Sequence, residues 1–267
     1  MKRSLRQHWP EYLIEAWCLG AFMISASFFG TALFHTNSPA VAAFGFWERN
    51  LLMGLAMGAT AAAIIRSPWG RRSGAHFNPA VTLAFLRLKK IRPADAFFYI
   101  VAHFAGGVAG VLFSWLVLGE LLADTSVNFV VTVPGSYGVE AAFVAEAAVA
   151  FAMMSMILFI SHSPIHARLT PYAAGMLLAI FITFEAPLSG MSMNPARTIA
   201  SAVVSNMWTG WWIYLTAPPL AMLTAAEVFV RIRGRHPASA GTARPERVDH
   251  TCNCNFGELK PLSQTQN

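Results

Sequence analysis

Long apolar stretches alternate with short polar connections along most of the chain. Six stretches have about the length of a membrane-spanning helix, which needs roughly 20 apolar residues. They run from Tyr12 to Phe34, Asn50 to Ile65, Ala94 to Leu118, Val139 to Ile160, Leu169 to Ala186 and Trp208 to Val230. The pattern therefore predicts six transmembrane helices.

Two further apolar stretches are too short to span a bilayer. Each opens with the same three residues, Asn78-Pro79-Ala80 and Asn194-Pro195-Ala196. An Asn side chain can cap the free N–H groups of a helix, and Pro suits the first helical position because it has no N–H to leave unpaired. Only about ten residues of helix can follow each motif, against the roughly 20 that a span requires. Both motifs therefore predict half-helices, which are tolerated at membrane depth only where they are buried in protein or line a cavity.

The two half-helices occupy equivalent places in the chain. They follow the second and the fifth predicted span, and Glu15 and Glu146 lie in the first span of each half. Three spans per half invert the second half relative to the first, so the half-helices should meet from opposite faces. We predict an all-α membrane protein with six transmembrane helices and two re-entrant half-helices, arranged as an inverted three-helix repeat over about residues 11–118 and 139–230.

Charge is scarce and unevenly placed. Hydrophobic residues make up 55% of the 267 residues and charged residues 12%, which excludes an ordinary soluble domain. The formal net charge of +6 does not indicate a nucleic-acid partner, because all of the 19 basic residues except Arg49 and Arg197 fall on one predicted side of the membrane. Cytoplasmic connections carry such an excess of Lys and Arg. Both termini are therefore expected in the cytoplasm, and the protein in the cell (plasma) membrane.

The two ends of the chain differ from the expected channel domain at residues 11–230. Residues 1–10 are predicted to be a cytoplasmic N-terminus, and residues 231–267 a disordered basic cytoplasmic tail, since their composition buries little apolar surface. Cys252 and Cys254 beside His250 form only one short cluster of potential metal ligands. We expect no metal and no cofactor.

With these features, the chain resembles the aquaporin and glycerol-facilitator family, the major intrinsic proteins, over about residues 10–230. The resemblance rests on the paired motifs, Gly74-Ala-His76-Phe-Asn78-Pro-Ala and Asn194-Pro-Ala-Arg197. It implies half-helices that meet tip to tip in a single-file pore, where Asn78 and Asn194 offer amides to the solute. It also implies a homotetramer with one pore per subunit. Thr198 and Ala202, where glycerol facilitators usually have Asp and often have Lys, favour the aquaporin-like branch.

A selectivity filter can be carried over from the resemblance. Arg197 would be its cation-repelling donor, because a charge at membrane depth is costly and usually faces a cavity. By spacing from Asn194, two further positions are Ile182 and Met191. The position in the second span is either Met53 or Met57, which lie one helical turn apart on the same face. Such a filter is mostly apolar and should admit more than water.

The resemblance assigns Glu15 and Glu146 to supporting the two broken segments through backbone N–H groups, and His76 to supporting the first of them. Ionisable residues inside spans are also candidates for a proton relay. That alternative would make the protein a proton-coupled secondary transporter.

The expected function is a passive channel for water, with small uncharged solutes as additional cargo. The main alternative is a facilitator for glycerol or other small neutral solutes, which the apolar filter favours. A non-conducting junction protein of the same fold is a further alternative. We do not expect an enzyme, because no nucleophile, base and orienting group come together in any segment.

Overall fold

The computed structural model describes residues 1–163 and 165–233, and every regular element within these ranges is a helix. The long helices are α1 (Lys2–Phe34), α3 (Phe46–Arg66), α6 (Pro93–Leu118), α8 (Gly138–Ser161), α9 (Thr170–Ser189) and α11 (Trp211–Arg233). The short ones are α2 (Pro39–Ala43), α4 (Pro68–Ser73), α5 (Pro79–Arg87), α7 (Glu120–Ala123), α10 (Pro195–Ser205) and the 3₁₀ turns η1 (Asn128–Val130) and η2 (Ala167–Leu169). The predicted all-α fold is confirmed.

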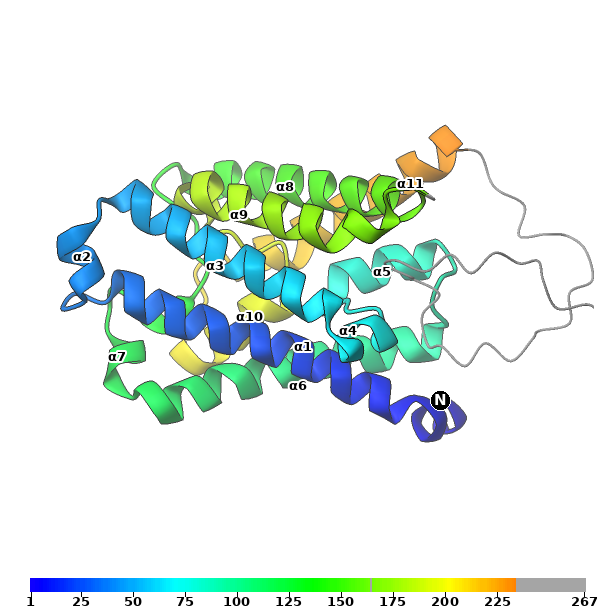
Figure 1. Ribbon diagram of the computed structural model, residues 1–267, viewed down its shortest axis with the longest axis horizontal. Helices are drawn as coiled ribbons and strands as arrows, with labels where there is room; N and C mark the ends of the chain where they lie inside the picture. The colour runs from blue at the N-terminus through cyan, green and yellow to red at the C-terminus, as the bar shows by residue number, and fades with distance from the viewer. Residues whose placement is uncertain (164, 234–267) are drawn as a thin grey trace, which may run out of the picture.

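The six long helices run along the long axis of the molecule and form one bundle (Figure 1). Five of them are long and apolar enough to cross a membrane; α3 is also 21 residues long, but it carries Glu48, Arg49 and Arg66 near its ends. Both ends of the described chain lie at the same end of the bundle, as an even number of spans requires (Figure 1).

Several helix bounds differ from the predicted ones. Helix α1 begins at Lys2, ten residues before the predicted span, and passes through a kink at His8 that lies just before Pro10. Apolar pattern alone does not detect this polar first part. Helix α11 continues to Arg233, past the predicted start of the tail at residue 231, and residues 234–267 lie outside the described residues.

The half-helices α5 and α10 lie inside the bundle. Their 9 and 11 residues correspond to about 14 and 17 Å at a rise of roughly 1.5 Å per residue, about half of the hydrocarbon thickness each. Figure 1 shows α5 nearer to the end that holds the N-terminus and α10 nearer to the opposite end, and the two contact each other. The bundle is therefore crossed once by two helices placed in series.

Glycines bring the long helices close together. A Cβ atom on Gly58 of α3 would overlap the carbonyl oxygen of Gly175 on α9, and a Cβ atom on Gly175 would overlap that of Gly58. In the same way, Gly106 of α6 lies against the backbone of Ala16 in α1. Small residues allow this approach, which is how helices pack tightly in a membrane.

The substitution Gly58→Val should therefore lower the midpoint of thermal unfolding of the detergent-solubilised protein, since overpacking costs about 1–3 kcal/mol. Gly45→Ala is the matched control, because a Cβ atom there meets only the Glu48 carboxylate at 3.4 Å. Equal midpoints for the two variants would contradict the close contact between α3 and α9.

Candidate functional site

Asn78 and Asn194 cap the two half-helices in the same way. Each has an extended backbone and precedes a proline at the first helical position. Asn78 Oδ1 accepts a hydrogen bond from the backbone N–H of Ala80 at 2.8 Å, and Asn194 Oδ1 accepts one from Ala196 at 3.0 Å. The sequence folds in this way because an N-cap oxygen pairs with N–H groups that have no partner inside the helix.

The same two side chains also join the two halves of the chain. Asn78 Nδ2 donates to the carbonyl oxygen of Met193 at 2.8 Å, and Asn194 Nδ2 donates to that of Phe77 at 2.8 Å. An amide nitrogen carries two hydrogens, and among the described residues nothing accepts the second one. Each half-helix tip therefore keeps one N–H for another acceptor.

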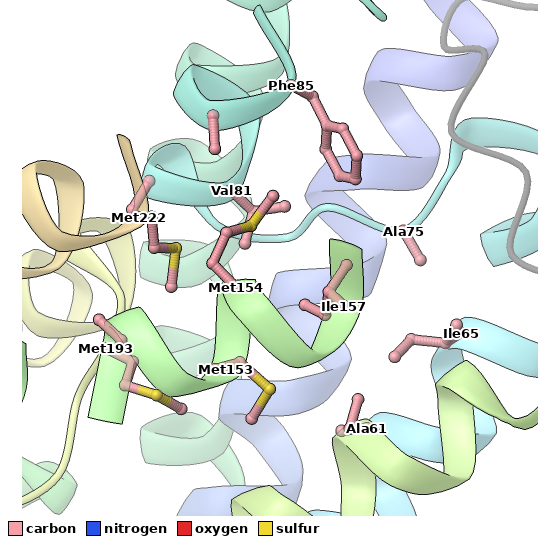
Figure 2. Packing of buried hydrophobic residues seen from close by; sticks show 14 of the residues in the cluster. Ala61, Ile65, Ala75, Val81, Phe85, Met153, Met154, Ile157, Met193 and Met222 are labelled. Atoms are coloured by element: carbon pink, nitrogen blue, oxygen red, sulfur yellow. The ribbon is translucent and has the colours of Figure 1, made fainter. Parts of the chain in front are cut away.

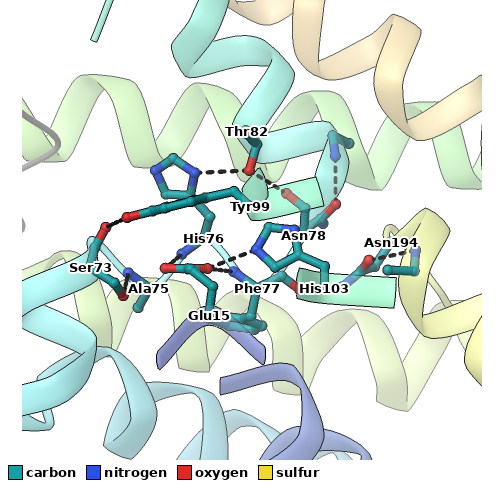
Figure 3. A network of polar contacts seen from close by, with 12 residues as sticks. Glu15, Ser73, Ala75, His76, Phe77, Asn78, Thr82, Tyr99, His103 and Asn194 are labelled. Carbon is teal, nitrogen blue, oxygen red and sulfur yellow. Dashed lines mark hydrogen bonds and ion pairs between the residues drawn. The ribbon is translucent and has the colours of Figure 1, made fainter. Parts of the chain in front are cut away.

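Glu15 holds the loop before α5. Its carboxylate accepts hydrogen bonds from the backbone N–H groups of His76 (3.1 Å) and Phe77 (2.7 Å) and from Nε2 of His103 (2.8 Å), as Figure 3 shows. Glu15 is fully buried. The carboxylate thus satisfies backbone donors that an irregular segment would otherwise leave unpaired at membrane depth.

Glu146 has the equivalent role before α10. Its oxygens accept from the backbone N–H groups of Ser192 (2.6 Å) and Met193 (2.7 Å) and from the hydroxyl of Ser189 (2.9 Å). It is also fully buried. Both carboxylates are therefore occupied by hydrogen bonds that fix the backbone.

The loops held by these carboxylates have unusual backbone angles. Phe77 and Met193, whose carbonyls accept from the asparagines, have φ values of 29° and 52°, and Ala75 and Met191 have 43° and 49°. Such conformations cost about 1–2 kcal/mol for a residue with a side chain. The hydrogen bonds to Glu15 and Glu146 offset that cost and keep the carbonyls turned toward the opposite tip.

Two tyrosines complete the support, and sequence reasoning missed them. The hydroxyl of Tyr99 donates to the carbonyl oxygen of Ser73 at 2.7 Å, and that of Tyr214 donates to Ser189 at 2.5 Å. The signal was present, because each motif is preceded by Ser-Gly and followed by a tyrosine in the next long helix. His76, predicted to support the first loop, is buried, and its Nδ1 lies 2.9 Å from the hydroxyl of Thr82.

A cavity of about 80 Å³ lies beside the two asparagines, on the side toward Ile65 and Thr170. One water molecule needs about 10–15 Å³ of such space, so the cavity has room for several. Apolar side chains form most of its wall, together with Asn78, Asn194 and His76. These apolar residues include Phe22, Ala61, Val81, Met153, Leu178 and Met222.

Arg197 lies in the first turn of α10 and is partly buried. Its Nη1 donates to the carbonyl oxygen of Val130 at 2.7 Å, in the turn η1, where Phe129 and Val130 have φ values of 52° and 49°. Its other guanidinium nitrogens have no hydrogen-bond partner among the described residues. These nitrogens are not fully buried. The guanidinium is therefore held on one side and accessible on the other.

The remaining filter candidates are apolar and belong to one cluster. Met191 and Met57 are buried in it, while Ile182 and Met53 are partly buried against it. The hydroxyl of Ser25 lies 3.8 Å from the sulfur of Met57. None of the four lines the described cavity, so the choice between Met53 and Met57 stays open.

The fold and the site together define a membrane protein whose bundle encloses two broken helices and an internal cavity. Residues 7–229 match the family model of the major intrinsic proteins. The chain belongs to this family.

Individual relatives agree with the family assignment. Aquaporin NIP2-2 of Zea mays is 37% identical over 177 residues, which cover 66% of this chain and 58% of the relative. Glycerol uptake facilitator protein-like 6 of Lactiplantibacillus plantarum is 33% identical over 231 residues, which cover 81% of this chain and 94% of the relative. The X-ray structure of the aquaglyceroporin from Plasmodium falciparum has the same fold, with a TM-score of 0.69 at 16% identity over 85% of this chain and 97% of that one. The match thus spans little more than half of the maize protein.

Replacing Glu146 with alanine should destabilise the loop before α10. Three donors would lose their acceptor, and a buried donor without a partner costs about 1–3 kcal/mol. Unfolding of the detergent-solubilised protein measures this loss. Glu140→Ala, an exposed position on the same helix, is the control; a similar loss for both variants would contradict the role of Glu146.

Proposed function

We propose that this protein is a passive channel that carries water across a membrane, with small uncharged solutes as further cargo. The observation that carries the proposal is the second amide N–H of Asn78 and of Asn194, which has no acceptor among the described residues and lies beside a cavity of about 80 Å³. A water molecule that passes the two tips can accept from these groups in turn.

The two half-helices favour neutral cargo. The N-terminal ends of α5 and α10 both carry Asn caps and face each other across the reciprocal bonds. A helix N-terminus bears partial positive charge, so two of them raise a barrier to cations and to a protonated water chain.

Arg197, Ile182, Met191 and one of Met53 and Met57 form the proposed selectivity filter. The accessible side of the Arg197 guanidinium offers donors to the solute, and its charge repels cations. The other members are apolar and hold water by few hydrogen bonds. This composition favours a second candidate cargo, glycerol or a similar small neutral solute.

A proton-coupled transporter is disfavoured. Glu15 and Glu146 each accept three hydrogen bonds that fix backbone or neighbouring side chains, and both are fully buried. A relay that changed their protonation would release the loops before the half-helices. The proposal includes no catalytic activity.

Placement in the plasma membrane with both termini in the cytoplasm is part of the proposal. It is supported by the basic residues of α4 and of the C-terminal ends of α3 and α5, namely Arg66, Arg71, Arg72 and Arg87. These parts of the chain lie toward the end of the bundle that holds both described ends (Figure 1). A homotetramer is proposed as well, and the apolar side chains exposed on the outer faces, such as Leu55 and Phe113, are compatible with lipid and with neighbouring subunits.

The purified protein in proteoliposomes should raise osmotic water permeability severalfold above that of protein-free vesicles. Stopped-flow light scattering measures the shrinkage. The flux should be the same in both directions and should not depend on an imposed pH gradient, since a channel conducts only downhill. Permeability equal to that of empty vesicles would refute the proposal, and accumulation driven by the pH gradient would favour the transporter.

Ile182→His tests the filter. The imidazole reaches further from the backbone than the isoleucine side chain and adds a donor, so glycerol permeability should fall more than water permeability, because the larger solute needs the lost width. Parallel flux measurements give the ratio of the two permeabilities, and Ile180→His, an exposed position on the same helix, should leave that ratio unchanged. An unchanged ratio for Ile182→His would remove this residue from the filter.

A further inference from the structure

Three methionine residues line the cavity beside the half-helix tips. Met153 comes from α8, Met193 from the loop before α10, and Met222 from α11. All three are buried, with 7%, 5% and 1% of their surface exposed. Figure 2 shows them among the apolar residues of this region. Segments far apart in the sequence thus bring three methionines to one small cavity.

Met154 provides a contrast within the same helix. It follows Met153 directly and is completely buried in the same apolar cluster, but it does not line the cavity. Successive residues of a helix point about 100° apart at 3.6 residues per turn, and Figure 2 shows the two side chains leaving α8 in different directions. Both methionines are buried, but only Met153 lines the cavity.

The thioether is the most easily oxidised group on the described wall of this cavity. Methionine reacts with peroxides to form the sulfoxide, without prior loss of a proton. Hydrogen peroxide is small and uncharged, and it donates and accepts hydrogen bonds as water does. Because the three side chains are buried, an oxidant in bulk water reaches them by way of the cavity.

We propose that Met153, Met193 and Met222 form an oxidation site inside the conduit, at which hydrogen peroxide converts the thioethers to sulfoxides and thereby reduces flux. The proposal rests on the proposed channel function. In the reaction the O–O bond of the peroxide breaks, one oxygen forms the S=O bond, and the other leaves as water with both hydrogens. The sulfur is oxidised by two electrons, and the peroxide is reduced by two.

Oxidation would change the conduit in two ways. Each sulfoxide adds an oxygen atom to the wall of a cavity of only about 80 Å³. The new oxygen is also a hydrogen-bond acceptor beside Asn78 and Asn194, whose second N–H groups have no partner among the described residues. A sulfoxide that accepts from these groups competes with the passing solute. Narrowing and competition both lower the flux.

The first test maps the oxidation. Reconstituted full-length protein is treated with hydrogen peroxide, and sulfoxide at each methionine is followed over time by peptide mass spectrometry. Met153, Met193 and Met222 should oxidise severalfold faster than Met154. Equal rates for Met153 and Met154 would overturn the proposal, because they would show that the cavity does not direct the oxidant.

The second test links oxidation to flux. Water permeability of the same vesicles should fall severalfold after treatment with hydrogen peroxide. The triple variant Met153→Leu, Met193→Leu, Met222→Leu, compared with its own untreated flux, should resist peroxide, whereas Met154→Leu should lose flux as the wild type does. A triple variant that loses flux like the wild type would overturn the proposal.

The two tests separate the inference from the channel function. Untreated wild-type protein that conducts no water contradicts the channel, whatever the sulfoxide map shows. Wild-type protein that conducts water before treatment and keeps its flux after complete oxidation of the three residues contradicts only the oxidation site.

Discussion

The structure depends on a single constraint, which is that two helices begin in the middle of the bundle. Each beginning leaves backbone N–H groups without partners, and no water is present in the hydrocarbon region to accept from them. Asn78 and Asn194 cap the helices, while Glu15 and Glu146 accept from the loops that lead into them. Because these four side chains pair with the free backbone N–H groups, the irregular segments before α5 and α10 can lie in the middle of the bundle.

The two halves meet this constraint with different chemistry. The first tip is surrounded by rings: the His76 ring stacks on Phe85 at 4.9 Å, and His103 donates to Glu15. The second tip relies on hydroxyl groups, with Ser189 bonded to Glu146 and Ser192 at 2.6 Å from Thr198. The inverted repeat therefore preserves the backbone geometry and its main side-chain partners, while the residue two positions before each asparagine differs, His76 in one half and Ser192 in the other.

The second tip is also tied to the connection before α8. Thr132 lies 2.8 Å from the hydroxyl of Thr198, and Arg197 donates to Val130. The positive φ values at Phe129 and Val130 turn this connection so that a carbonyl faces the guanidinium. Displacement of the connection would therefore move the proposed filter, whereas no such link is described at the first tip.

Much of the architecture could be predicted from the sequence, because its signals are local. Apolar length identified the long helices, and Asn-Pro-Ala identified the half-helices, since capping and the missing proline N–H act within a few residues. The hydroxyls of Tyr99 and Tyr214 and the carbonyl of Val130 were not predicted. Their contacts depend on how distant segments pack, which no single stretch of sequence specifies.

The apolar lining of the cavity, unlike Asn78 and Asn194, escaped prediction for the same reason, although it bears directly on the proposed conduction. Met153 and Met222 lie on different helices, and only packing brings them to one wall. The reciprocal bonds between the tips use one N–H of each asparagine, so each tip keeps a single donor for a solute. Conduction requires binding that is favourable enough for entry and weak enough for release. A mostly apolar wall with one donor from each tip would meet both requirements of the proposed channel, because a water molecule would be oriented at the asparagines and held only weakly beside the methionines.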